Sequence, residues 1–194
     1  MLSNAELDRY ARQIILPAFG GAGQAKLKAS HVAIVGAGGI GCPATTYLAA
    51  AGVGKLTIID HDRVEISNLQ RQPLFTDADI GELKAEVTAV AARRINPHVG
   101  VTPKPERLDD GNAEALFAGA DLILDGCDNF PTRLATNRAA VRLKIPLLSA
   151  AIGAFEGQVA LYEGWRADSP CYACLVGDDP DRPGINCAEA GVMG

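Results

Sequence analysis

The sequence has no excess of positive charge. It contains 18 Lys and Arg residues against 23 Asp and Glu, which leaves a formal net charge of −5 at pH 7. A broad surface that follows nucleic-acid phosphates needs the opposite balance. We therefore expect no nucleic-acid partner, although this composition still permits a local cluster of arginines.

The chain also has no uninterrupted apolar segment of membrane-spanning length. The stretch from Val32 to Gly54 carries no charge and is long enough to cross a bilayer, but glycines, threonines and Pro43 interrupt it. The N-terminal residues include Glu6 and Arg12 instead of an apolar signal segment. We expect a cytoplasmic protein without a membrane partner.

The overall composition is that of one globular domain. The chain has 194 residues, of which 48% are hydrophobic and 21% are charged. This length is close to that of a single domain of about 150 residues. The balance of apolar and charged residues supports a buried core and excludes a disordered or low-complexity chain.

Short apolar segments alternate with helical patterns along the chain. The expected helices cover 4–28 (with a Gly-rich break at 20–23), 39–51, 83–95, 113–117 and 131–143, and the expected strands cover 31–35, 56–59, 122–124 and 146–162, the last broken at Gly153 and Gly157. This alternation predicts an α/β, Rossmann-like fold, with a mostly parallel sheet, helices on both faces and the ligand at the carboxyl ends of the strands. We expect an N-terminal helical segment (1–28), a nucleotide-binding domain (29–164) and a Cys-containing segment (165–194), which together make effectively one domain.

A glycine-rich turn after the strand 31–35 gives the first functional signal. In order, its residues are Gly36, Ala37, Gly38, Gly39, Ile40 and Gly41. Small side chains there let backbone N–H groups approach a phosphate, and the dipole of the following helix favours the anion. Asp60 ends the next strand, where an acidic side chain commonly accepts hydrogen bonds from a ribose. These features predict a nucleotide site and fit NAD as well as ATP, with a tight structural turn as the alternative for the glycines.

Three further motifs bear on the chemistry. The segment from Asp60 to Gln72 reads DHDRVEISNLQRQ, Arg9 to Gln13 reads RYARQ, and Asp125 to Asn129 reads DGCDN. With these motifs, and with Lys84 at the start of a predicted helix, the chain resembles the ThiF/MoeB/HesA adenylyltransferases, which are relatives of the ubiquitin-activating enzymes. The resemblance covers about residues 9–193, and the motifs occur in the family's order.

This resemblance implies a role for each matched residue. The nucleotide would be held by Gly36, Gly38, Gly39, Gly41, Asp60, Asp62, Ser67, Asn68, Arg71, Lys84, Asp128 and Asn129. Asn68 and Arg71 would lie along the triphosphate, Lys84 would contact phosphate, and Asp128 would position Mg²⁺. Arg12 matches an arginine that, in dimeric members, reaches into the ATP site of the partner subunit. The resemblance therefore also implies a homodimer.

The implied activity is ATP-dependent adenylation of the C-terminal glycine of a ubiquitin-like sulfur-carrier protein that ends in Gly-Gly. Pyrophosphate is released, and the pathway would be molybdopterin, thiamine or related sulfur transfer. A terminal carboxylate with a pKa near roughly 3.5 is already ionised at pH 7, so the reaction needs no general base. The obstacle is repulsion between this anion and the polyphosphate. Arg12, Arg71, Lys84 and Mg²⁺ at Asp128 would offset it.

The 5 cysteines, in a chain expected to be cytosolic, indicate metal binding or reactivity before disulfides. Cys171 and Cys174 have zinc-ligand spacing, but two thiolates are only half of a tetrahedral site. Zinc-containing members of the family carry a second pair near the C-terminus, and this chain ends at Gly194 before such a pair. We therefore expect a truncated chain with half of a Zn²⁺ site.

The other cysteines differ in their expected roles. Cys187 matches a cysteine that forms a covalent link with the carrier protein in some family members, a role that requires a thiolate of low pKa. Cys42 and Cys127 are expected to be small buried side chains.

Other interpretations of the same residues stay open. A nicotinamide-dependent oxidoreductase shares the glycine turn and Asp60, but it leaves Arg71, Lys84 and Asp128 unexplained, unless these are ordinary solvated charges. A non-catalytic nucleotide-binding module would bind ATP without turnover. A family member that acts on a peptide carboxylate would differ only in its substrate.

Overall fold

The computed structural model describes residues 1–179 of the chain, and the centre of this part is one six-stranded sheet. The strands are β1 (His31–Val35), β2 (Lys55–Ile59), β3 (Gly100–Lys104), β4 (Leu122–Asp125), β5 (Leu147–Gly153) and β6 (Glu156–Tyr162). They lie in the order β3-β2-β1-β4-β5-β6, and all neighbours are parallel except β5 and β6. The predicted mostly parallel, Rossmann-like sheet is confirmed.

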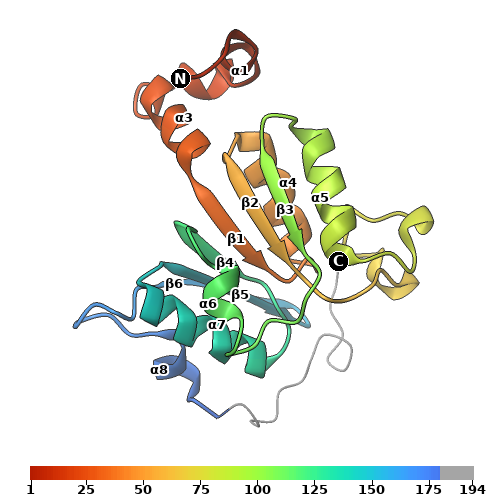
Figure 1. Cartoon of the computed structure of the whole chain (residues 1–194), viewed down its shortest axis with the longest axis vertical. Coiled ribbons are helices and arrows are strands. Elements are labelled where there is room, and N and C mark those ends of the chain that lie inside the picture. The colour runs from red at the N-terminus through yellow and green to blue at the C-terminus, as the bar shows by residue number, and fades with distance from the viewer. Residues whose placement is uncertain (180–194) are drawn as a thin grey trace.

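Helices cover both faces of the sheet (Figure 1). The α-helices are α1 (Asn4–Arg9), α2 (Ala11–Ile14), α3 (Gly20–Ala29), α4 (Gly41–Ala51), α5 (Lys84–Ile95), α6 (Ala113–Leu116), α7 (Phe130–Leu143) and α8 (Tyr172–Val176), with short 3-10 helices η1 (Ile66–Asn68) and η2 (Asp77–Asp79). Alternate residues of β1 enter two hydrophobic clusters: Val32 and Ile34 pack with α4 and α5, while Ala33 and Val35 pack with α6 and α7. Burial on both faces explains why β1 is apolar throughout.

The N-terminal helices lie at the end of the sheet where β1 begins, far from the carboxyl ends of the strands (Figure 1). The predicted break at residues 20–23 is wrong, because α3 starts at Gly20. The interruption instead falls between α2 and α3. Gln24 is fully buried, and its side-chain amide donates to the Ala51 carbonyl at 2.9 Å. Such tertiary contacts outweigh the low helix propensity of glycine.

The strand β3 is an element that the sequence pattern does not predict. It lies at the edge of the sheet, Val101 is its one buried residue, and it contains Pro103. Proline has no N–H group to donate to a neighbouring strand. It is tolerated on an edge strand because one side of that strand has no neighbour. A segment with so little apolar periodicity cannot be recognised as a strand from its sequence alone. Its identity as a strand comes from its pairing with β2.

The carboxyl ends of the central strands are level with one another. In the register of the sheet, Val35 at the end of β1 pairs with Ile59 of β2 and with Asp125 of β4. From β1 the chain adds β2 and β3 on one side, and it then crosses back to add β4 on the other side of β1. The strand order therefore switches between β1 and β4. In sheets of this topology the loops at such a point surround a ligand crevice.

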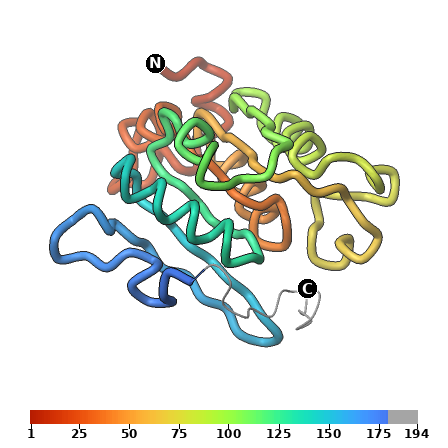
Figure 2. Tube along the Cα trace, turned by 60° about the horizontal axis from the view of Figure 1, so that its bottom comes forward, coloured from red at the N-terminus to blue at the C-terminus, as the bar shows by residue number. Residues whose placement is uncertain are grey.

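The last two strands form a hairpin that extends past the rest of the sheet (Figure 2). The turn lies at Ala154, which has a φ of 44°, and Gly157 belongs to β6 instead of breaking it. Among the residues that the structure describes, no helix is both long enough and apolar enough to span a membrane.

Candidate nucleotide-binding site

A cleft of about 680 Å³ opens at the carboxyl ends of the strands. The loops after β1, β2 and β4 form its walls, and residues of β5, β6 and α8 line its far end. The predicted residues that line it are Gly36, Gly38, Gly39, Asp60, Asp62, Ser67, Asn68, Arg71, Lys84, Asp128 and Asn129. Segments that are far apart in the sequence therefore meet at one cleft.

The glycines of the turn have different surroundings. Gly41 is buried outside the cleft lining, and a Cβ added to it would lie 1.9 Å from the Gly36 carbonyl oxygen. Its glycine is therefore required by the backbone that passes over it. A Cβ on Gly38 or Gly39 would meet nothing closer than 3.6 Å. The protein itself does not need glycine at these two positions, so the open space above them is available to a ligand.

Asp60 joins the glycine turn to the end of β2. One carboxylate oxygen accepts the Ala37 N–H at 2.7 Å, and the other accepts the Asp62 N–H at 2.8 Å. Burial raises the pKa of this carboxyl group, because the charged form loses water. Each oxygen keeps a second lone pair that can accept a ligand hydroxyl. Asp60 therefore fixes the turn and still lies on the cleft wall.

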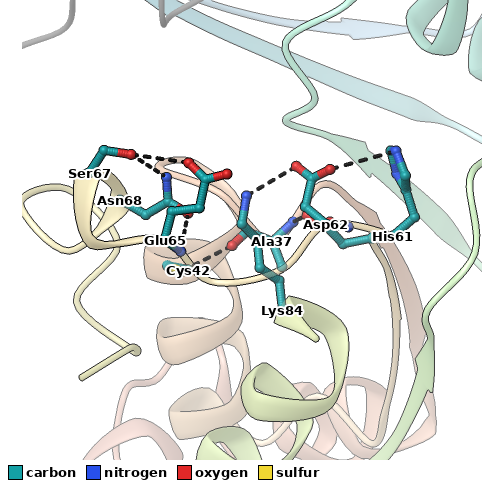
Figure 3. A network of polar contacts seen from close by, with 9 residues as sticks. Ala37, Cys42, His61, Asp62, Glu65, Ser67, Asn68 and Lys84 are labelled. Atoms are coloured by element: carbon teal, nitrogen blue, oxygen red, sulfur yellow. Dashed lines mark hydrogen bonds and ion pairs between the residues drawn. The ribbon is translucent and has the colours of Figure 1, made fainter. Parts of the chain in front are cut away.

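Lys84 and Asp62 form an ion pair on the wall of the cleft (Figure 3). The ammonium group lies 3.1 Å from the carboxylate, and the Lys84 side chain is only 9% exposed against 54% for Asp62. His61 approaches the other oxygen of Asp62 at 3.6 Å. Asp60, His61 and Asp62 come within metal-ligand reach of one another, but Asp60 already accepts two backbone N–H groups and Asp62 already pairs with Lys84.

The segment after β2 bends across the glycine turn and is held by its own side chains. The Asn68 side-chain oxygen accepts the Glu65 N–H at 3.2 Å and closes η1. The Ser67 hydroxyl donates to Glu65 at 3.3 Å, and Arg71 donates to the Ser67 carbonyl at 2.9 Å. The stem of Arg71 passes close to Gly39. The segment thus presents a guanidinium group beside the turn.

The loop after β4 supplies the opposite wall. The Asp128 carboxylate is exposed, and no hydrogen bond or ion pair with residues 1–179 engages it. Asn129 caps α7, since its side-chain oxygen accepts the Thr132 N–H at 3.0 Å. Beside the glycine turn, the cleft therefore combines the cations of Arg71 and Lys84 with the uncommitted carboxylate of Asp128.

Besides Gly41, three predicted site residues lie outside the cleft. Arg12 is exposed on α2 and does not line the cleft. Cys171 and Cys174 lie outside the cleft, with their sulfur atoms 3.5 Å apart. Burial raises the pKa of the Cys171 thiol, but hydrogen bonds with Asn137 and Cys174 lower it further, so the pKa stays below its ordinary value. Cys187 falls outside the described residues.

The prediction that Cys42 and Cys127 are small buried side chains is confirmed. They are 0% and 9% exposed. Burial raises the pKa of the Cys42 thiol to about 12 and that of Cys127 well above its ordinary value. Neither thiol is poised to act as a nucleophile near neutral pH.

Sequence reasoning assigned no role to several residues of the cleft. Gln72 is 3% exposed, and its side-chain oxygen has no partner among the described residues. Arg133, Ile152 and Tyr172 line the far end. Gln72 is the last residue of the 60–72 motif, and Arg133 lies in the first turn of the helix after Asp128, so their positions gave a weak indication of a place in the cleft. The places of Ile152 and Tyr172 in the cleft are evident only from the tertiary structure.

The two kinds of glycine lead to a matched prediction. Gly41→Ala should lower the free energy of unfolding by about 3 kcal/mol, because its Cβ would overlap the Gly36 carbonyl. Gly39→Ala should change stability by less than about 1 kcal/mol and weaken nucleotide binding about tenfold. Urea unfolding and nucleotide titration of both variants check this. Equal stability loss in the two variants would contradict the steric distinction.

Comparison with known proteins gives the family directly. The family model described as "ThiF family" matches residues 10–194. The chain is 47% identical to molybdopterin-synthase adenylyltransferase of Salmonella typhimurium, a match that covers 99% of this chain and 76% of the relative. It is 48% identical to the sulfur carrier protein adenylyltransferase of Thermus thermophilus, over 97% of this chain and 71% of that protein.

Solved structures share the fold. The Escherichia coli tRNA N6-threonylcarbamoyladenosine dehydratase TcdA, in complex with AMP, superposes with a TM-score of 0.75 at 29% identity, over 80% of this chain and 63% of that one. Escherichia coli MccB gives a TM-score of 0.77 at 29% identity, over 86% of this chain and 51% of that one. The chain thus spans half to two thirds of these solved chains. On the family match and the identity over nearly its whole length, the chain belongs to the ThiF family.

Proposed function

We propose that this chain is an ATP-dependent adenylyltransferase that activates the C-terminal glycine carboxylate of a ubiquitin-like sulfur-carrier protein, in molybdopterin-type, thiamine-type or related sulfur transfer. The observation that carries the proposal is the charge arrangement of the cleft. Arg71 and Lys84 lie on the walls beside an open glycine turn, and Asp128 faces them from the loop after β4. The related adenylyltransferases support the same reaction.

The arrangement suits a carboxylate nucleophile better than hydride transfer. Attack on the α-phosphorus of ATP by an ionised carboxylate breaks the phosphoanhydride bond to pyrophosphate. This step needs positive charge and alignment, and no base has to take up a proton. Lys84 and Arg71 supply that charge from fixed positions, because one is held by Asp62 and the other by the Ser67 carbonyl. A nicotinamide cofactor would give these two cations no task at the reacting atoms.

The carboxylate of Asp128 fits a magnesium ligand. It is an oxygen donor, as Mg²⁺ prefers, and the described residues leave it without a partner. Bound Mg²⁺ would neutralise phosphate charge as the bond to the leaving pyrophosphate breaks. The carboxylate oxygen of the substrate would form the new bond to the α-phosphorus, giving an acyl adenylate and pyrophosphate.

The role of Lys84 can be tested by ATP–pyrophosphate exchange with a carrier ending in Gly-Gly. Lys84→Met keeps most of the aliphatic stem but removes the charge, so exchange should fall at least about 100-fold. Arg94→Met is the control, because it removes an exposed cation from the other end of the same helix. Equal exchange rates in the two variants would contradict the assignment.

We also propose that the active form is a homodimer in which Arg12 completes the site of the partner subunit. Arg12 is exposed and lies outside the cleft of its own chain. A closed two-fold dimer would bring a second copy of α2 to each cleft. This arrangement would add a cation without any change in the fold of either subunit.

A mixed dimer tests this arrangement. Arg12→Ala and Asp128→Asn subunits with different tags should each be inactive alone, whereas the purified mixed dimer should recover about half of the wild-type exchange rate, because one of its two sites then holds both native residues. If the mixed dimer is as inactive as its parents, or if the chain stays monomeric at working concentrations, the proposal fails.

Cys171 and Cys174 fit half of a zinc site. Their sulfur atoms are 3.5 Å apart, close enough to share one tetrahedral ion. We expect Cys171→Ser to lower the zinc content of the purified protein, measured by atomic spectroscopy against Cys42→Ser as the control. Equal zinc content in both variants would exclude this site.

A further inference from the structure

A buried guanidinium group joins the ends of two strands beneath the cleft. Arg133, in the first turn of α7, is 7% exposed. It donates to the Cys127 carbonyl after β4, to the Ala150 carbonyl of β5 at 3.0 Å, and to the Ser149 hydroxyl at 3.3 Å. Its charge is balanced by Asp125, which is 1% exposed and lies 3.7 Å away. Four positions on two neighbouring strands and one loop are thus tied to one side chain.

A buried ion pair is a costly way to fill space. Removing two charges from water carries a penalty of several kcal/mol per ion, and an apolar side chain of similar size often gives equal stability. The planar guanidinium offers something that an apolar side chain does not, which is several donors in fixed directions. At Arg133 these directions reach two backbone carbonyls, one in the loop after β4 and one in β5. The arrangement fixes geometry more than it adds stability.

The loop that Arg133 contacts is the one that carries Asp128. The Cys127 N–H donates to Asp125 at 3.0 Å, and the Cys127 carbonyl accepts from Arg133, so both ends of this residue's backbone are held by the same ion pair. The Gly126 N–H donates to the Val35 carbonyl at 2.9 Å. The Asp128 side chain itself has no partner among residues 1–179. Its direction therefore depends on the backbone that precedes it.

The other arm of Arg133 reaches the far end of the cleft. Ser149 and Ala150 lead directly into Ala151 and Ile152, which line that end. One side chain thus sets the spacing between the carboxylate proposed for the metal and the wall along which an acyl substrate would enter.

We propose that Arg133 is a positioning residue that holds the Asp128 loop in register with the end of β5, so that the metal-binding carboxylate faces the phosphates of the bound nucleotide. This inference rests on one part of the proposed function, namely that Asp128 binds the metal of a metal–nucleotide complex in the cleft. Arg133 itself need not touch the reacting atoms.

The test compares Arg133→Lys with Ser149→Ala. Lysine keeps a cation beside Asp125, but its single amine cannot bridge both carbonyls and the hydroxyl. We expect Arg133→Lys to bind ATP in EDTA within about threefold of wild type and to need about tenfold more Mg²⁺ for half-maximal exchange, the size of effect that second-shell changes have on metal sites. Its kcat should fall about 100-fold while KM for ATP stays within threefold. Ser149→Ala, which removes one contact, should stay within about threefold throughout.

A binding readout separates this inference from the proposed function. Affinity for Mn²⁺–ATP, followed by electron paramagnetic resonance of the metal, should fall about tenfold in Arg133→Lys. If wild type shows no exchange but this loss is seen, adenylation fails and the positioning role stands. If exchange is normal and Arg133→Lys binds Mn²⁺–ATP as wild type does, the positioning role is overturned.

Loss of metal-free ATP binding by a folded Arg133→Lys would also overturn the inference, because the residue would then support the whole site. If that variant does not fold, Asp125→Asn replaces it. Asparagine can still accept the Cys127 N–H but removes the charge that holds Arg133. We expect about a threefold loss of Mn²⁺–ATP affinity, and unchanged affinity would overturn the proposal.

Discussion

The constraint on which the site depends is the common end of three parallel strands. Because Val35 pairs with both Ile59 and Asp125, the chain leaves β1, β2 and β4 at one edge of the sheet. The glycine turn, the Asp60–Asp62 segment and the Asp128 loop follow these strands directly, so the backbone pairing of the sheet brings them together before any side chain holds them. A shift of one residue in any of these pairings would turn the side chains of that strand to the opposite face and disperse the site.

Within this frame, charge is fixed by a few buried or half-buried acids. Asp60 accepts two backbone N–H groups and ties the glycine turn to β2, Asp62 holds Lys84, and Asp125 balances Arg133. Each acid therefore orients another group. The exception is Asp128, whose carboxylate stays without a partner among the described residues. An enzyme that stabilises a polyphosphate needs its cations held before the ligand arrives, since reorganisation during the reaction would cost part of the rate.

The sequence predicted the elements with strong apolar periodicity and the loops between them, because a buried parallel strand such as β1 has a recognisable composition. It did not predict β3, whose identity as a strand comes from pairing with β2, or the start of α3 at Gly20, which tertiary contacts of Gln24 stabilise. For the site, motif order indicated Lys84, Arg71 and Asp128, which the fold brings to one cleft. The sequence could not show that Gly41 is required by steric contact with the backbone whereas Gly39 leaves open space for a ligand, because this difference depends on which backbone atoms lie nearby in the fold. The contacts of Arg133 join residues that only the folded sheet makes neighbours.

The central claim is that this cleft joins a carboxylate oxygen to the α-phosphorus of ATP. The most direct measurement uses a carrier whose C-terminal carboxylate is labelled with a heavy oxygen isotope. The chain is incubated with this carrier, ATP and Mg²⁺, the product is cleaved with hydroxylamine, and the mass of the released AMP is determined. Hydroxylamine attacks the carbonyl carbon, so the oxygen that bridged to phosphorus leaves with AMP. We predict AMP that contains one labelled oxygen. Unlabelled AMP, or no AMP beyond a control without carrier, would contradict carboxylate attack at this site.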